Sequence, residues 1–418
     1  MRVLEELEKD KYWKETVDRM LKKDNLSMQQ RAEVSLLYSS GFKDEFIEQV
    51  KNSSYEWSTP RKVLLNKTGT TKKRVVYMYN IRDRFVLGVL YRVFSEVYRE
   101  HMAENCFSYK KGVRTLDAIT YLKRDRDICF EYGVKIDIKA YFNSVDKEYL
   151  NKMLLEISDS DEIYKLLSDI YMNDNVLVGE SVEQEYKSLI PGVAFGSFLA
   201  NYALKDIDNY IANELNLVYA RYSDDIIMFS KDEEDIHKAL EALKNKLNEL
   251  GLEINPKKYE WFYGDTDIDF LGLKIRQDGK VDVSDNSLSK LKRKIKHQCK
   301  LGRNRISRLG QDPYKVASDI IGRYNHKVYK CYIKDASRFG WAYYAFRFID
   351  TTDSLFQLDC YLKDRIRQMI TGKNNKANIT KVTEEKLREL GYVSMVEMYN
   401  KFKLDFDYYC NEVDLIKG

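Results

Sequence analysis

The sequence has few of the residues from which zinc sites and disulfide-stapled domains are built. Its 418 residues include six cysteines and four histidines, and no two cysteines form a Cys-x-x-Cys pair. This spacing argues against both kinds of site and favours a reducing, cytoplasmic setting. No apolar run approaches the length of a membrane span, and the amphipathic stretch 1–25 has no signal-peptide core. We therefore expect no membrane association.

Prolines and low-complexity linkers are also scarce. The chain has four prolines and no internal repeat, with 44% hydrophobic and 33% charged residues. This composition is typical of a globular protein, and the length is sufficient for two or three packed regions around one large core.

The net charge of +4 hides a strong asymmetry along the chain. Residues 287–349 contain sixteen Lys or Arg against three Asp, a net of +13, so the remainder has 54 basic and 63 acidic residues, a net of −9. The basic segment is interleaved with aromatic residues. Such a run is often only a solvated helical face, and most of these rings are expected in the core. Cations that neutralise phosphates beside rings that stack on bases nevertheless favour a nucleic-acid partner.

Two adjacent carboxylates lie between two short apolar runs. Tyr222-Ser223-Asp224-Asp225 follows the run 217–220 and precedes the run 226–229, a pattern that predicts strand, tight turn and strand. Taken alone, the pair fits an ordinary polar turn. Adjacent acids repel each other, however, and a bound cation would offset that repulsion.

A second acidic strand lies upstream, over residues 134–138. Val134, Ile136 and Ile138 alternate onto one face, so Asp137 is expected to point away from the core. Beside the hairpin it would complete a three-carboxylate site for two Mg²⁺ ions, with the Ile138 carbonyl as a further ligand. One ion would activate a primer 3′-hydroxyl, and the other would hold a nucleoside triphosphate.

In order and spacing, the motifs of residues 55–370 resemble those of bacterial reverse transcriptases related to retron, group II intron and abortive-infection enzymes. The first acidic motif matches 137–142, and the second matches 222–225. The other matching stretches are 72–74, 83–84, 104–114, 192–201, 251–258, 270–272 and 358–367.

The resemblance implies an α+β right-hand polymerase with an antiparallel palm sheet and a helical thumb. The predicted parts are an N-terminal helical extension over 1–54, fingers over 55–130, a palm over 131–283, a basic helical thumb over 284–370 and a C-terminal helical tail over 371–418. The implied reaction is Mg²⁺-dependent synthesis of cDNA from dNTPs on an RNA template.

The resemblance also implies roles for individual residues. Catalysis is assigned to Asp137, Asp224, Asp225 and Lys258, with Lys257 competing with Lys258 as the general acid that protonates pyrophosphate. The predicted metal ligands are Asp137, Ile138, Asp224 and Asp225. The predicted nucleotide contacts are Lys72, Arg74, Tyr141, Phe142, Gly192 and Tyr222. The predicted nucleic-acid contacts are Arg84, Arg114, Phe270, Leu271, Gly272, Lys292, Arg293 and Arg365.

Phe142 is expected to select the sugar of the nucleotide. A ring against C2′ leaves no room for a 2′-hydroxyl, so dNTPs are preferred, although a plain core phenylalanine fits the same position. Arg74 and Lys72 fall on one face of a strand, directed toward the triphosphate.

The glycine motif departs from the family pattern. Ile190 and Pro191 stand where Pro-Gln precedes the glycine, and 193–198 also differ. This departure favours a divergent, defence-associated lineage that copies a dedicated non-coding RNA or synthesises DNA with little template guidance. The 48 residues after 370 are too few for an RNase H or endonuclease domain, which we take to indicate a single dedicated cDNA product.

Two other functions stay open from the sequence. One is a template-independent, abortive-infection-type DNA polymerase, for which a protein hydroxyl is a candidate primer, with no primer residue identifiable among 32 tyrosines. The other is a non-catalytic RNA-binding maturase, which has no need of the three aspartates.

Overall fold

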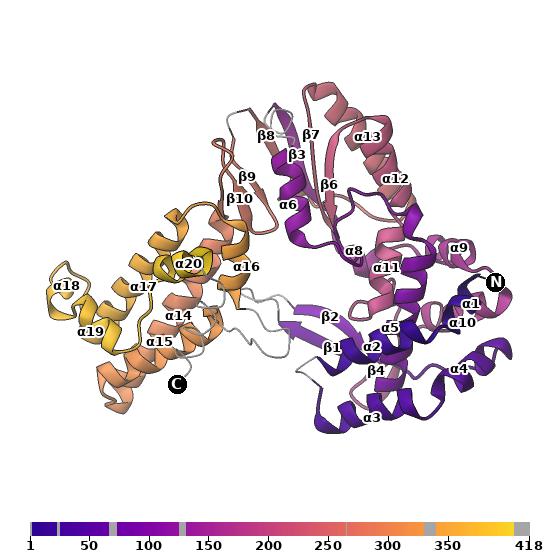
Figure 1. Cartoon of the computed structure of the whole chain (residues 1–418), viewed down its shortest axis with the longest axis horizontal. Helices are drawn as coiled ribbons and strands as arrows, with labels where there is room; N and C mark the ends of the chain where they lie inside the picture. The colour runs from indigo at the N-terminus through magenta and orange to yellow at the C-terminus, as the bar shows by residue number, and fades with distance from the viewer. Residues whose placement is uncertain are drawn as a thin grey trace. The chain divides into compact units, whose positions relative to one another are not determined.

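The computed structural model describes residues 2–22, 26–66, 73–124, 131–264, 266–329 and 340–404. The chain divides into two separately packed units, residues 1–265 and 266–418 (Figure 1). Of the predicted site residues, Lys72 lies outside the described residues.

The N-terminal extension is helical, as the sequence predicted. Its helices are α1 (Arg2–Leu7), α2 (Asp10–Leu21), α3 (Met28–Ser39) and α4 (Phe42–Lys51). The buried face of α2 packs on α5 (Ile81–Val97). A Cβ added at Gly88 of α5 would lie 2.8 Å from Cγ2 of Thr16, so the absence of a side chain permits this close approach.

A four-stranded sheet forms the fingers, in the order β2-β1-β4-β5. Its strands are β1 (Arg61–Asn66), β2 (Lys73–Met78), β4 (Asn175–Val178) and β5 (Ser181–Gln184). β1 is antiparallel to β2 and parallel to β4. The hairpin 175–184, which the sequence placed within a continuous palm, therefore pairs with the fingers strands instead.

A second four-stranded sheet, entirely antiparallel, has the order β6-β7-β3-β8. Its strands are β3 (Tyr132–Asp137), β6 (Val218–Tyr222), β7 (Asp225–Ser230) and β8 (Glu260–Tyr263). Helices α12 (Lys205–Asn209) and α13 (Glu233–Glu249) run along this sheet in Figure 1, and α13 contacts both β3 and β7. The predicted antiparallel palm sheet is confirmed.

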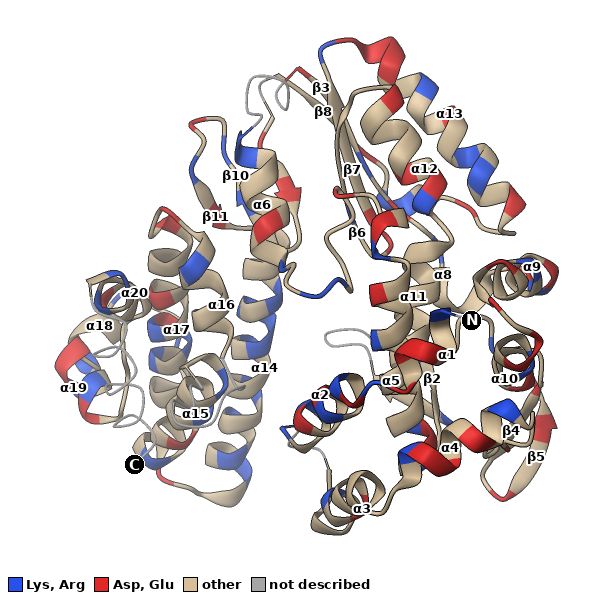
Figure 2. Ribbon diagram, turned by 45° about the vertical axis from the view of Figure 1, so that its right-hand side comes forward, with Lys and Arg blue, Asp and Glu red and all other residues tan. Residues whose placement is uncertain are grey.

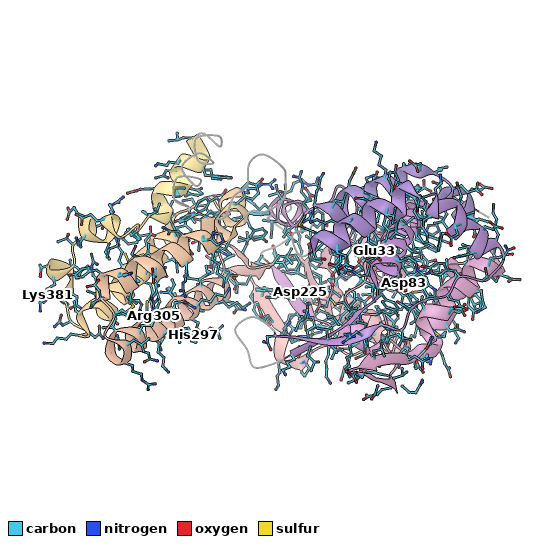
Figure 3. The ribbon with its side chains drawn as sticks, turned by 90° about the horizontal axis from the view of Figure 1, so that it is seen from below. Glu33, Asp83, Asp225, His297, Arg305 and Lys381 are labelled. Carbon is cyan, nitrogen blue, oxygen red and sulfur yellow. The ribbon has the colours of Figure 1, made fainter. Side chains whose placement is uncertain are left out.

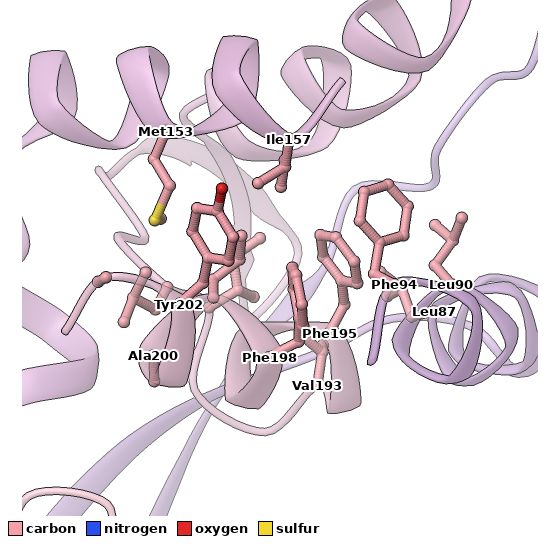
Figure 4. Close-up of a cluster of buried hydrophobic side chains, with 14 of the residues drawn as sticks. Leu87, Leu90, Phe94, Met153, Ile157, Val193, Phe195, Phe198, Ala200 and Tyr202 are labelled. Carbon is pink, nitrogen blue, oxygen red and sulfur yellow. The ribbon is translucent and has the colours of Figure 1, made fainter. Parts of the chain in front are cut away.

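The core of the first unit is largely aromatic where α5 meets α11 (Ala194–Tyr202). Phe94 of α5 packs edge-to-face on Phe195 and Phe198 of α11, with centroids 4.9 and 5.6 Å apart (Figure 4). Such rings bury large apolar areas and fix the two helices together. The remaining elements are η1 (Arg99–His101), α6 (Thr115–Arg124), α8 (Tyr141–Ser144), α9 (Lys147–Ile157), α10 (Asp161–Tyr171), the π-helical turn η2 (Tyr210–Glu214) and η3 (Pro256–Lys258).

The second unit joins a small antiparallel sheet to a set of helices. The strands are β9 (Ile268–Phe270), β10 (Leu273–Ile275) and β11 (Val281–Val283). The helices are α14 (Asp285–Leu309), α15 (Pro313–Tyr329), α16 (Trp341–Phe348), α17 (Asp353–Thr371), α18 (Asn378–Lys381), α19 (Glu384–Glu389) and α20 (Met395–Leu404). Because β11 contacts α16 and α17, this sheet packs with the helices, and the boundary lies near 265 rather than at the predicted 283.

The predicted tail after residue 370 packs on α17. Asp359 of α17 accepts hydrogen bonds from Oγ of Ser394 at 2.7 Å and from the amide of Met395 at 2.9 Å, which fixes the start of α20. None of the helices in the described ranges has the length and apolarity needed to cross a bilayer.

Candidate active site

The palm sheet brings the predicted aspartates together at one end. Asp137, the last residue of β3, is the register partner of Asp225, the first residue of β7. Ser223 and Asp224 form the turn between β6 and β7, with Ser223 at φ 63°. The Ile138 amide donates to the Asp224 carbonyl at 3.0 Å. The predicted hairpin is confirmed, and Figure 3 labels Asp225 in this site.

A network of buried polar side chains fixes the conformation of the turn between β6 and β7. The guanidinium of Arg221, fully buried, donates from Nε to Oδ1 of Asp208 at 2.8 Å and from Nη1 to the Ser223 carbonyl at 3.2 Å. The Ser223 amide donates to Oγ of Ser108 at 2.9 Å, and the Asn201 side chain donates to the Ser108 carbonyl at 2.7 Å. Satisfied buried networks are rigid, so the turn is held in one conformation.

Asp137 is held by the segment that follows α13. The Asn255 side chain donates to Oδ1 of Asp137 at 3.0 Å, and the Lys258 ammonium forms an ion pair with Oδ2. Asp137 is 5% exposed, so the carboxylate is more enclosed than the strand pattern predicted, because this segment covers it. Of the two adjacent lysines that the sequence left open, Lys258 is the one with a contact to the acidic cluster in the structure.

Burial and mutual repulsion disfavour the charged forms of Asp224 and Asp225. Burial, and then the charge of Asp137, raise the pKa of Asp224. Burial, and then the charge of Asp224, raise the pKa of Asp225 to about 6. Burial lowers the pKa of Lys258, but its hydrogen bond and ion pair with Asp137 outweigh burial and raise that pKa. A cation at this site would relieve the repulsion between the carboxylates.

The described residues contain no group of three or more Asp, Glu, His or Cys side chains positioned to hold a metal ion. Both carboxylate oxygens of Asp137 are instead engaged by Asn255 and Lys258. The residue types nevertheless fit Mg²⁺, because Asp137, Asp224 and Asp225 all lie at the same end of the palm sheet and carboxylate oxygens are ligands that Mg²⁺ prefers. The ligand assignment, Ile138 included, stays a prediction.

The predicted nucleotide contacts occupy different environments. Phe142 is partly exposed on α8, whereas Tyr141 is 2% exposed and its hydroxyl bonds the Ala200 carbonyl. The prediction that Tyr141 contacts the nucleotide is wrong for its side chain, which lies in the core. Arg74 is exposed on β2, where it pairs with Leu65 of β1.

Gly192 lies against the fingers strand β2. Its φ is 105°, and an added Cβ would be 3.3 Å from Cβ of Val76. The Tyr77 amide donates to the Pro191 carbonyl at 3.0 Å, and Ile190 is buried at φ 52°. The altered motif is therefore anchored to β2, and only glycine suits the position of residue 192.

Two cavities share Arg19, Tyr91, Arg92 and Tyr109 in their linings. The smaller, of about 260 Å³, brings Arg84 and Gly192 together. The larger, of about 770 Å³, includes Tyr222 and residues of α2. Burial lowers the pKa of Arg84. Arg114 is exposed and lines neither cavity.

In the second unit, Leu271 and Gly272 form the two-residue turn between β9 and β10, at φ 53° and 82°. Two positive φ values match the hairpin turns that follow strand twist. Phe270 is buried, so its predicted contact with nucleic acid is wrong, whereas the turn itself is partly exposed. The Leu271 carbonyl accepts from the Tyr344 hydroxyl at 3.0 Å.

Helix α14 presents a basic stripe to solvent (Figure 2). Arg305 pairs with Asp319 at 2.6 Å. By contrast, the exposed lysines and arginines of α14 make no ion pair with another described residue. They are Lys290, Arg293, Lys296, Lys300, Arg303 and Arg308. Lys292 lies beside this stripe with Nζ 3.4 Å from Gln357, and Arg365 of α17 stacks over Tyr361 at 4.9 Å. Unpaired cations in a row are suited to a phosphate backbone.

Sequence reasoning missed the residues that position the aspartates. Asn255 was quoted only as part of a motif, and Arg221 and Asp208 were not singled out. The signal for Arg221 was its place directly before the acidic turn, in a strand whose other residues are apolar or aromatic. A charge at such a position requires a buried partner, but the sequence does not identify that partner.

An antiparallel sheet with three aspartates at one end, a fingers sheet and a helical thumb define a right-hand polymerase, a nucleotidyltransferase. Residues 65–275, which are 211 of the 418, match the family described as reverse transcriptase (RNA-dependent DNA polymerase). The chain therefore belongs to the reverse transcriptase family.

Two solved telomerase structures are among those that match this chain. Apo telomerase from Candida tropicalis, truncated from its C-terminal domain, is 13% identical over 55% of this chain and 55% of its own, with a TM-score of 0.43. Telomerase from Candida albicans, in complex with the TWJ fragment of telomeric RNA, is 12% identical over 92% of this chain and 70% of its own, with a TM-score of 0.45. The chain thus covers about half of the first structure. No curated protein matches its sequence.

Proposed function

We propose that this chain synthesises DNA on an RNA template, with two Mg²⁺ ions held by Asp137, Asp224 and Asp225. The observation that carries the proposal is the register of Asp137 with Asp225 at the end of the palm sheet. Asp137, Asp224 and Asp225 would hold the Mg²⁺ ions, which would supply Lewis-acid activation of a 3′-hydroxyl and charge neutralisation of a triphosphate. The Arg221–Asp208 pair and Asn255 hold the carboxylates for this purpose.

Other residues of the chain bind and orient the substrate. Arg74 is placed on the fingers strand to contact phosphate, and Phe142 lies beside the acidic motif to exclude a 2′-hydroxyl. Lys258, whose pKa is raised by Asp137, carries the proton that pyrophosphate takes as it leaves. The basic stripe of α14 follows the phosphates of the template–primer duplex.

The template is proposed to be a dedicated non-coding RNA, copied into one cDNA in the cytoplasm of a bacterium as part of anti-phage defence. The support is the altered motif at 190–192, which replaces the usual glutamine with a buried Ile190 and Pro191. The same observation favours a second candidate, template-free DNA synthesis, because an amide that touches the template strand is missing.

The two candidates are separated by removing RNA. The protein is purified with its nucleic acid, which is sequenced, and dNTP incorporation is measured before and after RNase treatment. Loss of incorporation supports templated synthesis, and persistence supports the template-free function. Asp44→Ala, an exposed aspartate on α4, is the matched control for Asp224→Ala.

A further inference from the structure

Tyr109 is held in a conformation that its residue type rarely adopts. It lies between η1 and α6 at φ 51°, in the left-handed region where a Cβ is unfavourable. The Tyr91 hydroxyl donates to the Tyr109 carbonyl at 2.7 Å, and the neighbouring Ser108 is fully buried in the network under the catalytic turn. The backbone on both sides of Tyr109 is therefore fixed.

The Tyr109 side chain joins two parts of the active site. Its hydroxyl lies 3.2 Å from Oγ of Ser223 in the catalytic turn. Its ring meets Phe142 edge-to-face, with centroids 6.1 Å apart and an interplanar angle of 81°. Through these two contacts the Tyr109 side chain bridges the turn after β6 and the helix α8.

Phe142 is thus supported by an aromatic ring on each of two sides. Tyr141 packs against it edge-to-face at 5.8 Å and is itself anchored in the core through the Ala200 carbonyl. Tyr109 is the more exposed support, since 38% of its surface is accessible and it lines both cavities. Removing Tyr109 would leave the Phe142 ring free to turn away from the nucleotide.

We propose that Tyr109 is a positioning residue that sets the preference for dNTPs over NTPs by bracing Phe142. The proposal rests on the proposed function, in which Phe142 excludes the 2′-hydroxyl. The hydroxyl of Tyr109 has a separate effect, because its contact with Ser223 links the loop 102–113 to the turn that carries Asp224.

The test is single-nucleotide primer extension on a supplied RNA template, with dNTP and NTP compared for each variant. Tyr109→Ala is expected to lower the ratio of kcat/KM for dNTP over NTP by about three- to tenfold, the size of one edge-to-face pair. The change arises chiefly from a lower KM for NTP. Tyr109→Phe keeps this ratio and lowers kcat for both sugars, since it retains the ring and loses the bond to Ser223.

A double-mutant cycle distinguishes bracing from a general structural role. Phe142→Ala alone removes most of the discrimination, and adding Tyr109→Ala then changes the ratio no further. Tyr38→Ala is the matched control, because Tyr38 is 36% exposed and also makes a hydrogen bond, to Asp10, far from this site in the fold. It is expected to retain the wild-type ratio.

An unchanged ratio in Tyr109→Ala, or additive losses in the double variant, overturns the proposal. If Tyr109→Ala does not fold, as judged by thermal melting against Tyr38→Ala, Tyr109→Leu replaces it with the same expected loss. If the wild type extends primers with dNTPs and Tyr109→Ala retains the wild-type dNTP/NTP ratio, only the role proposed for Tyr109 is contradicted. A wild type that incorporates neither nucleotide contradicts the proposed function together with this inference.

Discussion

At the tip of the catalytic hairpin, Asp225 lies partly buried beside Asp224, and burial followed by that charge raises its pKa to about 6. An unfolded aspartate titrates near ~3.9. Because the folded pKa is the higher one, the contribution of Asp225 to stability is fully present below pH ~4 and is lost as the pH rises through about 6. At neutral pH the charged form of Asp225, a proposed metal ligand, therefore lowers the stability of the free protein.

Asp225→Asn is therefore expected to raise the melting temperature at pH 7.5 by about 2–4 °C while abolishing dNTP incorporation. The gain shrinks by about half at pH 5, where the wild-type carboxyl is mostly protonated in the folded state. Added Mg²⁺ raises the melting temperature of the wild type more than that of the variant. Equal gains at both pH values would show that the Asp225 charge is not the cause.

Substitution of Arg221 is expected to lower the stability of the protein, whereas Asp225→Asn is expected to raise it. Arg221→Leu leaves Asp208 buried without its partner and releases the Ser223 carbonyl, and breaking such a pair costs about 3–5 kcal/mol. We expect a large fall in the free energy of unfolding, measured by urea denaturation. Arg323→Leu, at an exposed position of α15, is the control with little expected effect. A stable Arg221→Leu with wild-type activity would contradict the role given to this network.

The proposed metal-binding aspartates were easier to predict than the residues that hold them in place. Asp137, Asp224 and Asp225 could be found because each lies at or next to the end of an apolar strand. Tyr141 was misassigned because the strand alternation ends at Ala140, whose φ is 52°. The directions of the Tyr141 and Phe142 side chains are then set by helix α8. Arg221 and Asn255 depend on partners distant in sequence.

At the scale of elements, strands were predictable from apolar alternation but their partners were not. The segment 175–184 lies between palm segments in the chain, yet β4 joins β1 through parallel pairing that no local pattern specifies. Similarly, β9–β11 follow the palm motifs in sequence but pack with α16 and α17. Pairing is set by burial across the whole core.

The basic stripe of α14 supports a prediction about nucleic-acid binding. Arg293→Gln with Lys300→Gln is expected to weaken binding of an RNA–DNA duplex and to reduce the slope of log K against log salt by about 0.7–0.9 per residue. Lys152→Gln with Lys244→Gln, both exposed in the first unit, is the matched control. Fluorescence anisotropy at several salt concentrations measures the slope. Equal slopes in the two double variants would exclude the stripe from the interface.

At the scale of the whole molecule, the acidic excess and the basic excess fall in different parts of the sequence and in different packed units. The acidic excess lies outside residues 287–349, and the basic excess lies within them, on helices of the second unit. The three proposed catalytic aspartates thus belong to the first unit, and the basic stripe of α14 belongs to the second. This division was predictable from composition, whereas the boundary near 265 was not, because no linker composition marks it.

Templated synthesis by the palm aspartates is tested most directly by extension of a DNA primer on an RNA template of defined sequence. The account predicts that the wild type, with Mg²⁺, adds the complementary dNTP, that Asp224→Ala adds none, and that Asp44→Ala is unaffected. Incorporation by Asp224→Ala equal to that of the wild type would contradict it.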